Sequence, residues 1–244
     1  MRFPTTEWDL LDALNAGDEE KRREALGSII SLYGAPLFAF ARRESHFELS
    51  PEDCEDLVND FFLKCLEEPI LQHADQARGR FRNFLARSFK NMMLNADRAE
   101  HARKRCPDGG FVSVQTLTEE YGPALEPRTN ETPEDAFERV LRHAVFTRLL
   151  KAFEHRCLAA GQEKRFRLFM LREIRPHVDG TSAPTYDELA RKLNLPSQNA
   201  ANKILLAARE EFRSMLFAEV SRDCESQKEA QVECDLVLAA ALQK

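Results

Sequence analysis

The stretch of the chain with the clearest chemistry is residues 78–105, where cationic side chains are gathered. It holds nine Arg or Lys and two acidic residues, although the whole chain of 244 residues carries a net charge of -6. Apolar residues interrupt the cations at a helical period. Cations collected on one element of an acidic protein usually mark a polyanion site. The run predicts a helix that binds nucleic acid, with a solvated helix end as the alternative for residues 98–105.

The run directly upstream, residues 48–68, has the opposite sign, with eight acids and one lysine. Its start, residues 50–53 (SPED), combines an N-cap serine, a proline at the first helical position and a carboxylate three residues after the cap. An apolar stripe follows, and we expect it to leave five polar residues on the exposed side: Asp53, Asp56, Asn59, Asp60 and Lys64. This surface suits a basic protein partner; a plain solvated helix face is the alternative.

No residue pattern in the chain predicts catalysis, a cofactor or a metal site. No His lies at a helical offset that would complete a metal site with the acids of residues 48–68, and no phosphate-binding glycine loop or nucleophile elbow is present. The cysteines show no CxxC or zinc-finger spacing and are expected to be reduced packing residues: Cys54, Cys65, Cys106, Cys157, Cys224 and Cys234. We therefore expect a protein that is not an enzyme; a helical enzyme has little support.

A second DNA-binding pattern lies near the C-terminus. Residues 185–197 (TYDELARKLNLPS) read as a helix, a tight turn and a fresh N-cap, and a further helix is expected from Gln198 to about Val220. Together these form a helix-turn-helix pattern, which is moderately specific when taken alone.

The elements that must position these residues are helical. Hydrophobic residues make up 43% of the chain, and only nine Gly and three Tyr argue against a β fold. Helices are expected from about Glu19 to Tyr33 and again after Pro36. We predict an all-α protein with two helical domains joined by a polar linker. Its parts are an N-terminal segment (1–23), a first domain (24–105), the linker (106–134), a second domain (135–220) and a C-terminal tail (221–244).

Taken in order, these segments resemble the extracytoplasmic-function sigma factors of bacteria, and most of all the group common in planctomycetes and myxobacteria. Residues 33–43 (YGAPLFAFARR), 50–58 (SPEDCEDLV) and 78–85 (RGRFRNFL) look like region two of that family. Residues 186–190 (YDELA) and 208–213 (AREEFR) are similar to region four. The resemblance covers roughly residues 24–105 and 135–220, and the joint order of the motifs is more specific than either motif alone.

The resemblance implies roles for the residues of region two. The acidic helix would dock on the β′ clamp helices of core RNA polymerase through Asp53, Asp56, Asn59 and Asp60. The β subunit of the polymerase would be a further partner. The basic helix and the loop before it would bind the melted strand of the minus-ten promoter element. The residues implied in that contact are His73, Asp75 and Gln76 in the loop, and Arg80, Arg82, Arg87, Lys90, Asn91 and Arg98 from the basic run.

For region four, the resemblance implies that the second helix of the helix-turn-helix reads the major groove of the minus-thirty-five element. Gln198, Asn199, Asn202 and Lys203 would reach base edges. Arg209 and Arg213 would face phosphates or a neighbouring protein. This helix carries fewer cations than is usual in the family, because Ala207, Ala208, Glu210 and Glu211 occupy its middle.

The expected function is therefore that of a sigma factor that directs core polymerase to promoter DNA. The alternatives are a sigma-like interaction protein and a plain helix-turn-helix regulator, neither of which opens promoters. An anti-sigma factor, a phosphorylation event or the C-terminal tail could gate the activity. Uninterrupted apolar stretches fall far short of the roughly 20 residues that span a bilayer, and residues 1–10 lack an apolar signal core. We expect no membrane association and a cytoplasmic location.

Overall fold

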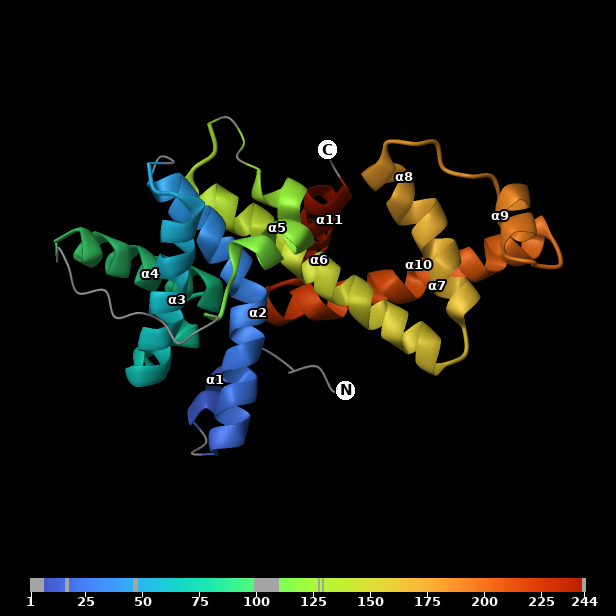
Figure 1. Ribbon diagram of the computed structural model, residues 1–244. Coiled ribbons are helices and arrows are strands. Elements are labelled where there is room, and N and C mark those ends of the chain that lie inside the picture. Colours follow the sequence, from blue (N-terminus) through green and yellow to red (C-terminus); the bar gives the residue numbers. More distant parts are fainter. Residues whose placement is uncertain are drawn as a thin grey trace. The chain divides into compact units, whose positions relative to one another are not determined.

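The computed structural model describes residues 7–15, 18–45, 48–98, 110–126, 128 and 130–242, apart from the side chains of residues 7–9, 15, 76, 96–98 and 123. Every element found in these residues is a helix (Figure 1), which confirms the all-α prediction. In order they are α1 (Glu7–Asn15), α2 (Glu19–Glu44), α3 (Pro51–Glu67), η1 (Ile70–His73), η2 (Gln76–Arg78), α4 (Phe81–Arg98), α5 (Val114–Leu125), α6 (Pro133–Ala159), α7 (Glu163–Phe169), η3 (Met170–Ile174), α8 (Arg175–Asp179), α9 (Tyr186–Lys192), α10 (Gln198–Val220), η4 (Ser221–Asp223) and α11 (Gln227–Leu242).

The chain divides into two compact units, residues 1–144 and 145–244. The division falls inside α6, so the first turns of that helix belong to the first unit. The second unit therefore begins ten residues, or nearly three helical turns, after the expected start of the second domain at residue 135. A capping box starts α6: Thr132 Oγ1 accepts a hydrogen bond from the Asp135 amide at 3.1 Å, and the Asp135 carboxylate accepts one from the Thr132 amide at 3.2 Å.

Helix α2 forms the centre of the first unit. Asp18 caps it by accepting hydrogen bonds from the amides of Glu20 and Lys21, and residues 32–41 are all buried. The break expected around Pro36 is wrong, because the helix runs through it. Proline removes one intrahelical hydrogen bond, but the burial of both flanks holds the helix together.

Helix α2 is also the one helix among the described residues that is long and apolar enough to cross a bilayer. The window that meets this criterion is 72% buried inside the fold, as in the core helix of a globular protein. The cytoplasmic location remains a prediction.

Helices α3 and α4 pack their aromatic residues against α2. The ring centroids of Phe61 and Phe89 lie 5.3 Å apart in an edge-to-face arrangement, and those of Phe40 and Phe89 lie 6.1 Å apart. Phe81, Leu85 and Phe89 of α4 are fully buried. The buried stripe of α4 therefore follows every fourth residue from Phe81 to Met93.

The expected polar linker, residues 106–134, contains the ordered helix α5. Its apolar residues Leu117 and Tyr121 are buried, as is Val112 just before it, and α5 contacts both α2 and α3 (Figure 1). Arg139 of α6, itself 8% exposed, donates hydrogen bonds to the carbonyls of Ala124 and Glu126 at the end of α5 and pairs with Glu131 at 2.6 Å. Residues 110–126 thus belong to the folded first unit.

The second unit is built around α10. Phe153 of α6, Phe169 of α7 and Phe212 of α10 form its aromatic centre, with centroid distances of 5.0 to 5.8 Å. Helix α11 adds Ala230, Cys234 and Val237 to the same core. Helices α7 and α8 follow one another with a five-residue π-helical turn, Met170–Ile174, between them.

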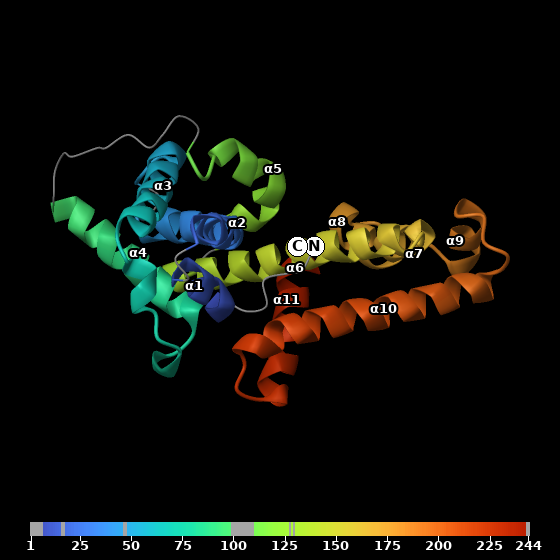
Figure 2. The ribbon, with the colours of Figure 1, turned by 90° about the horizontal axis from the view of Figure 1, so that it is seen from below.

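The predicted helix, turn and helix are confirmed as elements (Figure 2), and the turn has a clear physical basis. Thr185 and Glu188 form a capping box at the start of α9. At its end, Asn194 adopts a left-handed conformation (φ 49°), and the Leu195 amide donates to the Ala190 carbonyl at 2.9 Å. Ser197 then caps α10 through the amide of Ala200.

Candidate nucleic-acid and protein interfaces

The acidic helix α3 begins as the sequence predicts. The Asp53 carboxylate accepts hydrogen bonds from the Ser50 amide and hydroxyl, so it works as a capping residue. Asp56 is exposed, and Asp53 and Asp60 are half-buried. These three carboxylates remain on the outward side of α3, where a basic partner can reach them.

Asn59 is not on that surface, and the prediction of an exposed side chain is wrong. Its side chain is 2% exposed. Asn59 Oδ1 accepts hydrogen bonds from the amides of Phe111 and Val112, each at 2.8 Å, and Nδ2 donates to the Val112 carbonyl at 3.0 Å. The side chain satisfies the backbone of a segment more than 50 residues away in sequence, so it anchors that segment instead of meeting a partner.

Glu55 contributes a second anchor beside Asn59. Its carboxylate accepts a hydrogen bond from the Val114 amide at 2.6 Å, at the first residue of α5. One flank of α3 is therefore occupied by residues 110–114. Away from that flank, the carboxylates of Asp53, Asp56 and Asp60 lie along one face of α3, with Asp56 exposed and the other two half-buried.

The outward face of α4 carries a polar strip, which we define as Arg80, Asn83, Arg87 and Asn91. Asn83, Arg87 and Asn91 are exposed, and Arg80, which just precedes the helix, is half-buried. Their spacing of three, four and four residues places them along one face. Within the helix, a rise of about 1.5 Å per residue separates Asn83 from Asn91 by roughly 12 Å along the axis.

Two of the predicted DNA-binding cations are engaged within the protein. Arg82 is 8% exposed, and its Nε lies 3.1 Å from a carboxylate oxygen of Glu138 in α6. Its expected outward position is wrong, because it lies beside the buried stripe of α4. Lys90 lies 3.1 Å from Glu44 and 3.5 Å from Glu134. The hydrogen bond to Glu44, supported by Glu134, raises the pKa of Lys90 above its usual value.

The loop before α4 keeps its predicted residues at the surface. His73 and Asp75 are exposed. The Asp75 carboxylate accepts a hydrogen bond from the Ala77 amide at 3.0 Å and pairs with Arg78 at 3.3 Å. Both contacts are within the loop, so Asp75 stabilises the loop conformation. The side chains of Gln76 and Arg98 and all of residues 99–109 lie outside the described part of the chain.

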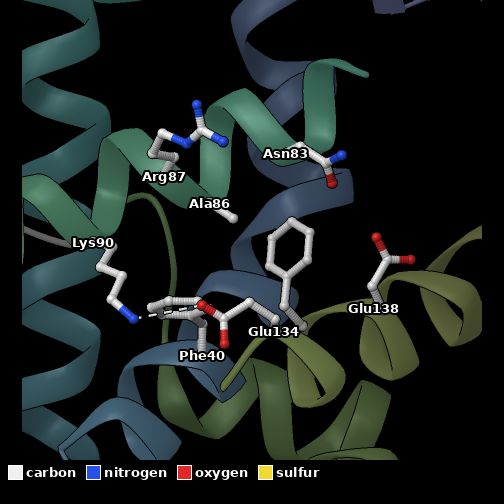
Figure 3. Close-up of a pocket in the computed structure, with 8 residues that line it drawn as sticks. Phe40, Asn83, Ala86, Arg87, Lys90, Glu134 and Glu138 are labelled. Atoms are coloured by element: carbon white, nitrogen blue, oxygen red, sulfur yellow. Dashed lines mark hydrogen bonds and ion pairs between the residues drawn. The ribbon is translucent and has the colours of Figure 1, made fainter. Parts of the chain in front are cut away.

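A pocket of about 320 Å³ opens beside the polar strip (Figure 3). Helix α4 supplies one wall, with Ala86 as its smallest residue, while α2 and α6 supply the others. The complete lining is Phe40, Asn83, Ala86, Arg87, Lys90, Glu134, Phe137 and Glu138. Figure 3 shows the Lys90 ammonium directed at the Glu134 carboxylate across it. Sequence reasoning missed this pocket, because half of its lining lies outside α4 and comes together only in the fold.

In the second unit, the N-terminal end of α10 presents most of the residues expected to read bases. Gln198, Asn199 and Lys203 are exposed, and Asn202 is half-buried. Arg209 is instead held by Glu173 at 2.6 Å, and this hydrogen bond raises the pKa of its guanidinium. Arg213 is exposed. Arg209 is therefore a poor candidate for a phosphate contact.

A second pocket, of about 460 Å³, lies between the start of α7 and α10. It brings Lys164 and Arg165 beside Lys203, although neither of the first two belongs to the helix-turn-helix pattern. Arg165 pairs with Glu211 at 2.7 Å, and Lys164 donates to the Asn194 carbonyl at 3.2 Å. The basic character of the sequence around residues 163–167 is the signal that could have pointed to them.

The described residues hold no group of metal-ligating side chains. Four of the six cysteines, Cys54, Cys65, Cys157 and Cys234, are buried, as expected of packing residues. Burial raises the pKa of Cys65 to about 12 and that of Cys54 to about 11. Cys224 is half-buried, and Cys106 lies outside the described residues.

Comparison with protein-family models, with curated proteins and with solved structures found no significant match.

Proposed function

We propose that this protein is a sigma factor of the extracytoplasmic-function type, which binds core RNA polymerase and directs it to promoter DNA. The observation that carries the proposal is the charge separation within one compact unit. The carboxylates of Asp53, Asp56 and Asp60 lie on α3. The cations Arg80 and Arg87 lie on the polar strip of the next long helix, α4. A protein that must meet a basic partner and a polyanion at the same time needs two such surfaces.

The proposed division of labour follows the charges. The carboxylate row of α3 docks on the β′ clamp helices, where opposite charge speeds association and sets register. The polar strip of α4 holds phosphates of the melted strand, with His73 and Asp75 in the loop beside it. The N-terminal end of α10 reads duplex DNA through Asn199 and Lys203, and Gln198 and Asn202 lie beside them.

The first experiment is binding to bacterial core RNA polymerase in competition with another sigma factor. The test variant is Asp56→Arg/Asp60→Arg, and the matched control is Glu119→Arg/Glu225→Arg, which changes the charge equally at exposed positions on α5 and before α11. We expect the control to compete like the parent and the test variant to lose binding by a factor of ten or more, on the order of 1.4 kcal/mol or greater. Equal binding by both variants, with helicity retained in circular dichroism, would reject α3 as the docking helix.

A second candidate is a sigma-like interaction protein that binds polymerase and opens no promoter. The observation in its favour is the electrostatics of α10. Arg209 is held by Glu173, and Glu210 and Glu211 follow it directly, so few cations remain for duplex phosphates. Transcription from a promoter library separates the two candidates, because the interaction protein would bind polymerase and yield no transcript. A plain helix-turn-helix regulator would bind DNA equally well after charge reversal in α3.

A further inference from the structure

The pocket between α7 and α10 lies within the second unit and has the volume of a small-ligand site. The two helices contact each other (Figure 1). The volume of about 460 Å³ falls within the roughly 300–1,000 Å³ typical of such sites. Lys164, Arg165 and Lys203 line the pocket, and none of its lining residues is acidic. Cations gathered around a concave surface attract anions, so the pocket suits a negatively charged ligand.

Arg165 forms a fixed part of the wall. Its guanidinium donates hydrogen bonds to the Gln162 side-chain oxygen at 3.0 Å and to the Ala207 carbonyl at 2.7 Å. It also pairs with Glu211 at 2.7 Å, and Arg156 pairs with the same carboxylate at 3.2 Å. Two guanidinium groups therefore share one carboxylate, so this group of three side chains keeps a positive charge.

The two lysines of the pocket have donors to offer a ligand. The Lys164 ammonium donates to the Asn194 carbonyl at 3.2 Å, and an ammonium has three donors. Lys203 is exposed on α10. An ammonium binds phosphate well as a compact point charge. A phosphate monoester carries about two negative charges at neutral pH, which match the two lysines better than the single charge of a carboxylate does.

The rest of the lining is apolar enough to hold a second part of the ligand. Ile204 is half-buried and Ala207 is exposed, and both side chains line the pocket on α10. The aliphatic stems of Lys164 and Lys203 add apolar surface below their charged ends. A ligand that carries an apolar group next to its phosphate would cover this surface and gain more than inorganic phosphate.

We propose that this pocket binds a small molecule in which a phosphate monoester is joined to an apolar group. Lys164 and Lys203 hold the phosphate, and Ile204 and Ala207 contact the apolar group. The site itself goes beyond the proposed function and does not depend on it. One consequence does depend on it: Lys203 belongs to the end of α10 proposed to reach bases, so the bound molecule should compete with duplex DNA.

The test is a titration of the full-length, ¹⁵N-labelled protein with hexyl phosphate, inorganic phosphate, hexanoate and hexanol, followed by NMR. Hexyl phosphate should shift the amide signals of Ile204 and Ala207. It should bind at least tenfold more tightly than inorganic phosphate, which lacks the apolar group, and than hexanoate, which carries less charge. Unmoved signals at these amides, or equal binding of hexanol, would overturn the proposal.

Variants at exposed positions locate the ligand without endangering the fold. Lys164→Gln/Lys203→Gln should weaken hexyl phosphate binding at least tenfold and flatten its salt dependence. The matched control Arg175→Gln/Lys228→Gln removes the same charge at exposed positions of α8 and α11 and should bind like the parent. Ala207→Phe adds bulk to the pocket and no charge, so it should weaken binding and leave the salt dependence unchanged.

The outcomes separate the ligand site from the proposed function. If the parent, the lysine variant and the control bind hexyl phosphate equally, the pocket is not the site. If hexyl phosphate does not bind and the lysine variant loses affinity for duplex DNA, these lysines contact the DNA backbone, so the ligand site is rejected and the proposed function stands. If hexyl phosphate binds as expected and the protein binds neither polymerase nor DNA, the ligand site stands and the proposed function falls.

Discussion

Replacing Asn59 by alanine tests the most consequential difference between the expected and observed roles of α3. The side chain makes hydrogen bonds with the amides of Phe111 and Val112 and with the Val112 carbonyl, at 2.8, 2.8 and 3.0 Å. Asn59→Ala removes all of them at once. We expect the first unit to lose stability and residues 110–114 to loosen from α3.

The loss of folding free energy depends on which backbone groups of residues 111 and 112 stay buried and cannot hydrogen-bond to water instead. Val112 is 6% exposed, so its amide and carbonyl would both be buried and unpaired, at a cost of about 1–3 kcal/mol each. The Phe111 amide is only partly buried and can reach water. Because the segment can also detach to hydrate these groups, we expect the lower part of the range, about 2–4 kcal/mol.

Urea unfolding followed by circular dichroism measures the loss, and hydrogen exchange at the Val112 amide locates it. The matched control is Asp56→Ala, an exposed position one turn earlier on the same helix, which should change stability by no more than about 0.5 kcal/mol. If the two variants unfold at the same urea concentration and the Val112 amide keeps its protection, the Asn59 contact contributes nothing and the reasoning fails.

Three further predictions concern other parts of the structure. Gly110→Ala should destabilise the first unit by about 1–3 kcal/mol in thermal unfolding, because φ is 55° and an added Cβ would meet Asn59 Nδ2 at 2.9 Å; a neutral result would mean that this turn relaxes freely. Hydrogen bonds from the Thr185 amide and hydroxyl lower the pKa of Glu188 below its ordinary value, so its capping contribution should be present at neutral pH and lost as pH falls through the folded-state pKa. Glu188→Gln should flatten that dependence in melts between pH 7 and pH 3, and an unchanged profile would contradict the assignment. Cys54 and Cys65, whose thiol pKa values burial raises to about 11 and about 12, should resist a thiol reagent at pH 8 until the protein is unfolded, as mass spectrometry of labelled peptides can check; labelling of Cys65 in native protein would show that the core opens readily.

Helix starts were predictable because their signals are local. Ser50, Thr132 and Thr185 each accept a hydrogen bond from an amide three residues later, and that arrangement is readable in a short stretch of sequence. The same holds for the αL turn at Asn194, which a short polar side chain tolerates. A local signal was misleading at Pro36, where proline predicted a helix break. The neighbouring residues do not reveal how deeply α2 is buried, and that burial keeps the helix continuous.

The candidate site was predictable only in outline. Charge segregation between residues 48–68 and 78–105 is a property of the sequence, and it remains the basis of the proposed function. The sequence did not predict which polar residues of these helices are exposed to solvent. Asn59 and Arg82 lie at the edges of apolar stripes, and periodicity treats such edge positions as solvent-facing.

By itself, the sequence determined the helical class, the helix caps and the separation of acidic from basic surface. The tertiary structure alone decided that residues 110–126 fold onto the first unit, because their backbone is satisfied by Asn59 and Arg139. It also decided that Arg82 and Lys90 pair with acids of distant helices, and that a pocket forms beside α4. The physical reason is that a buried hydrogen bond or ion pair depends on partners far away in the chain, whose approach no local pattern encodes.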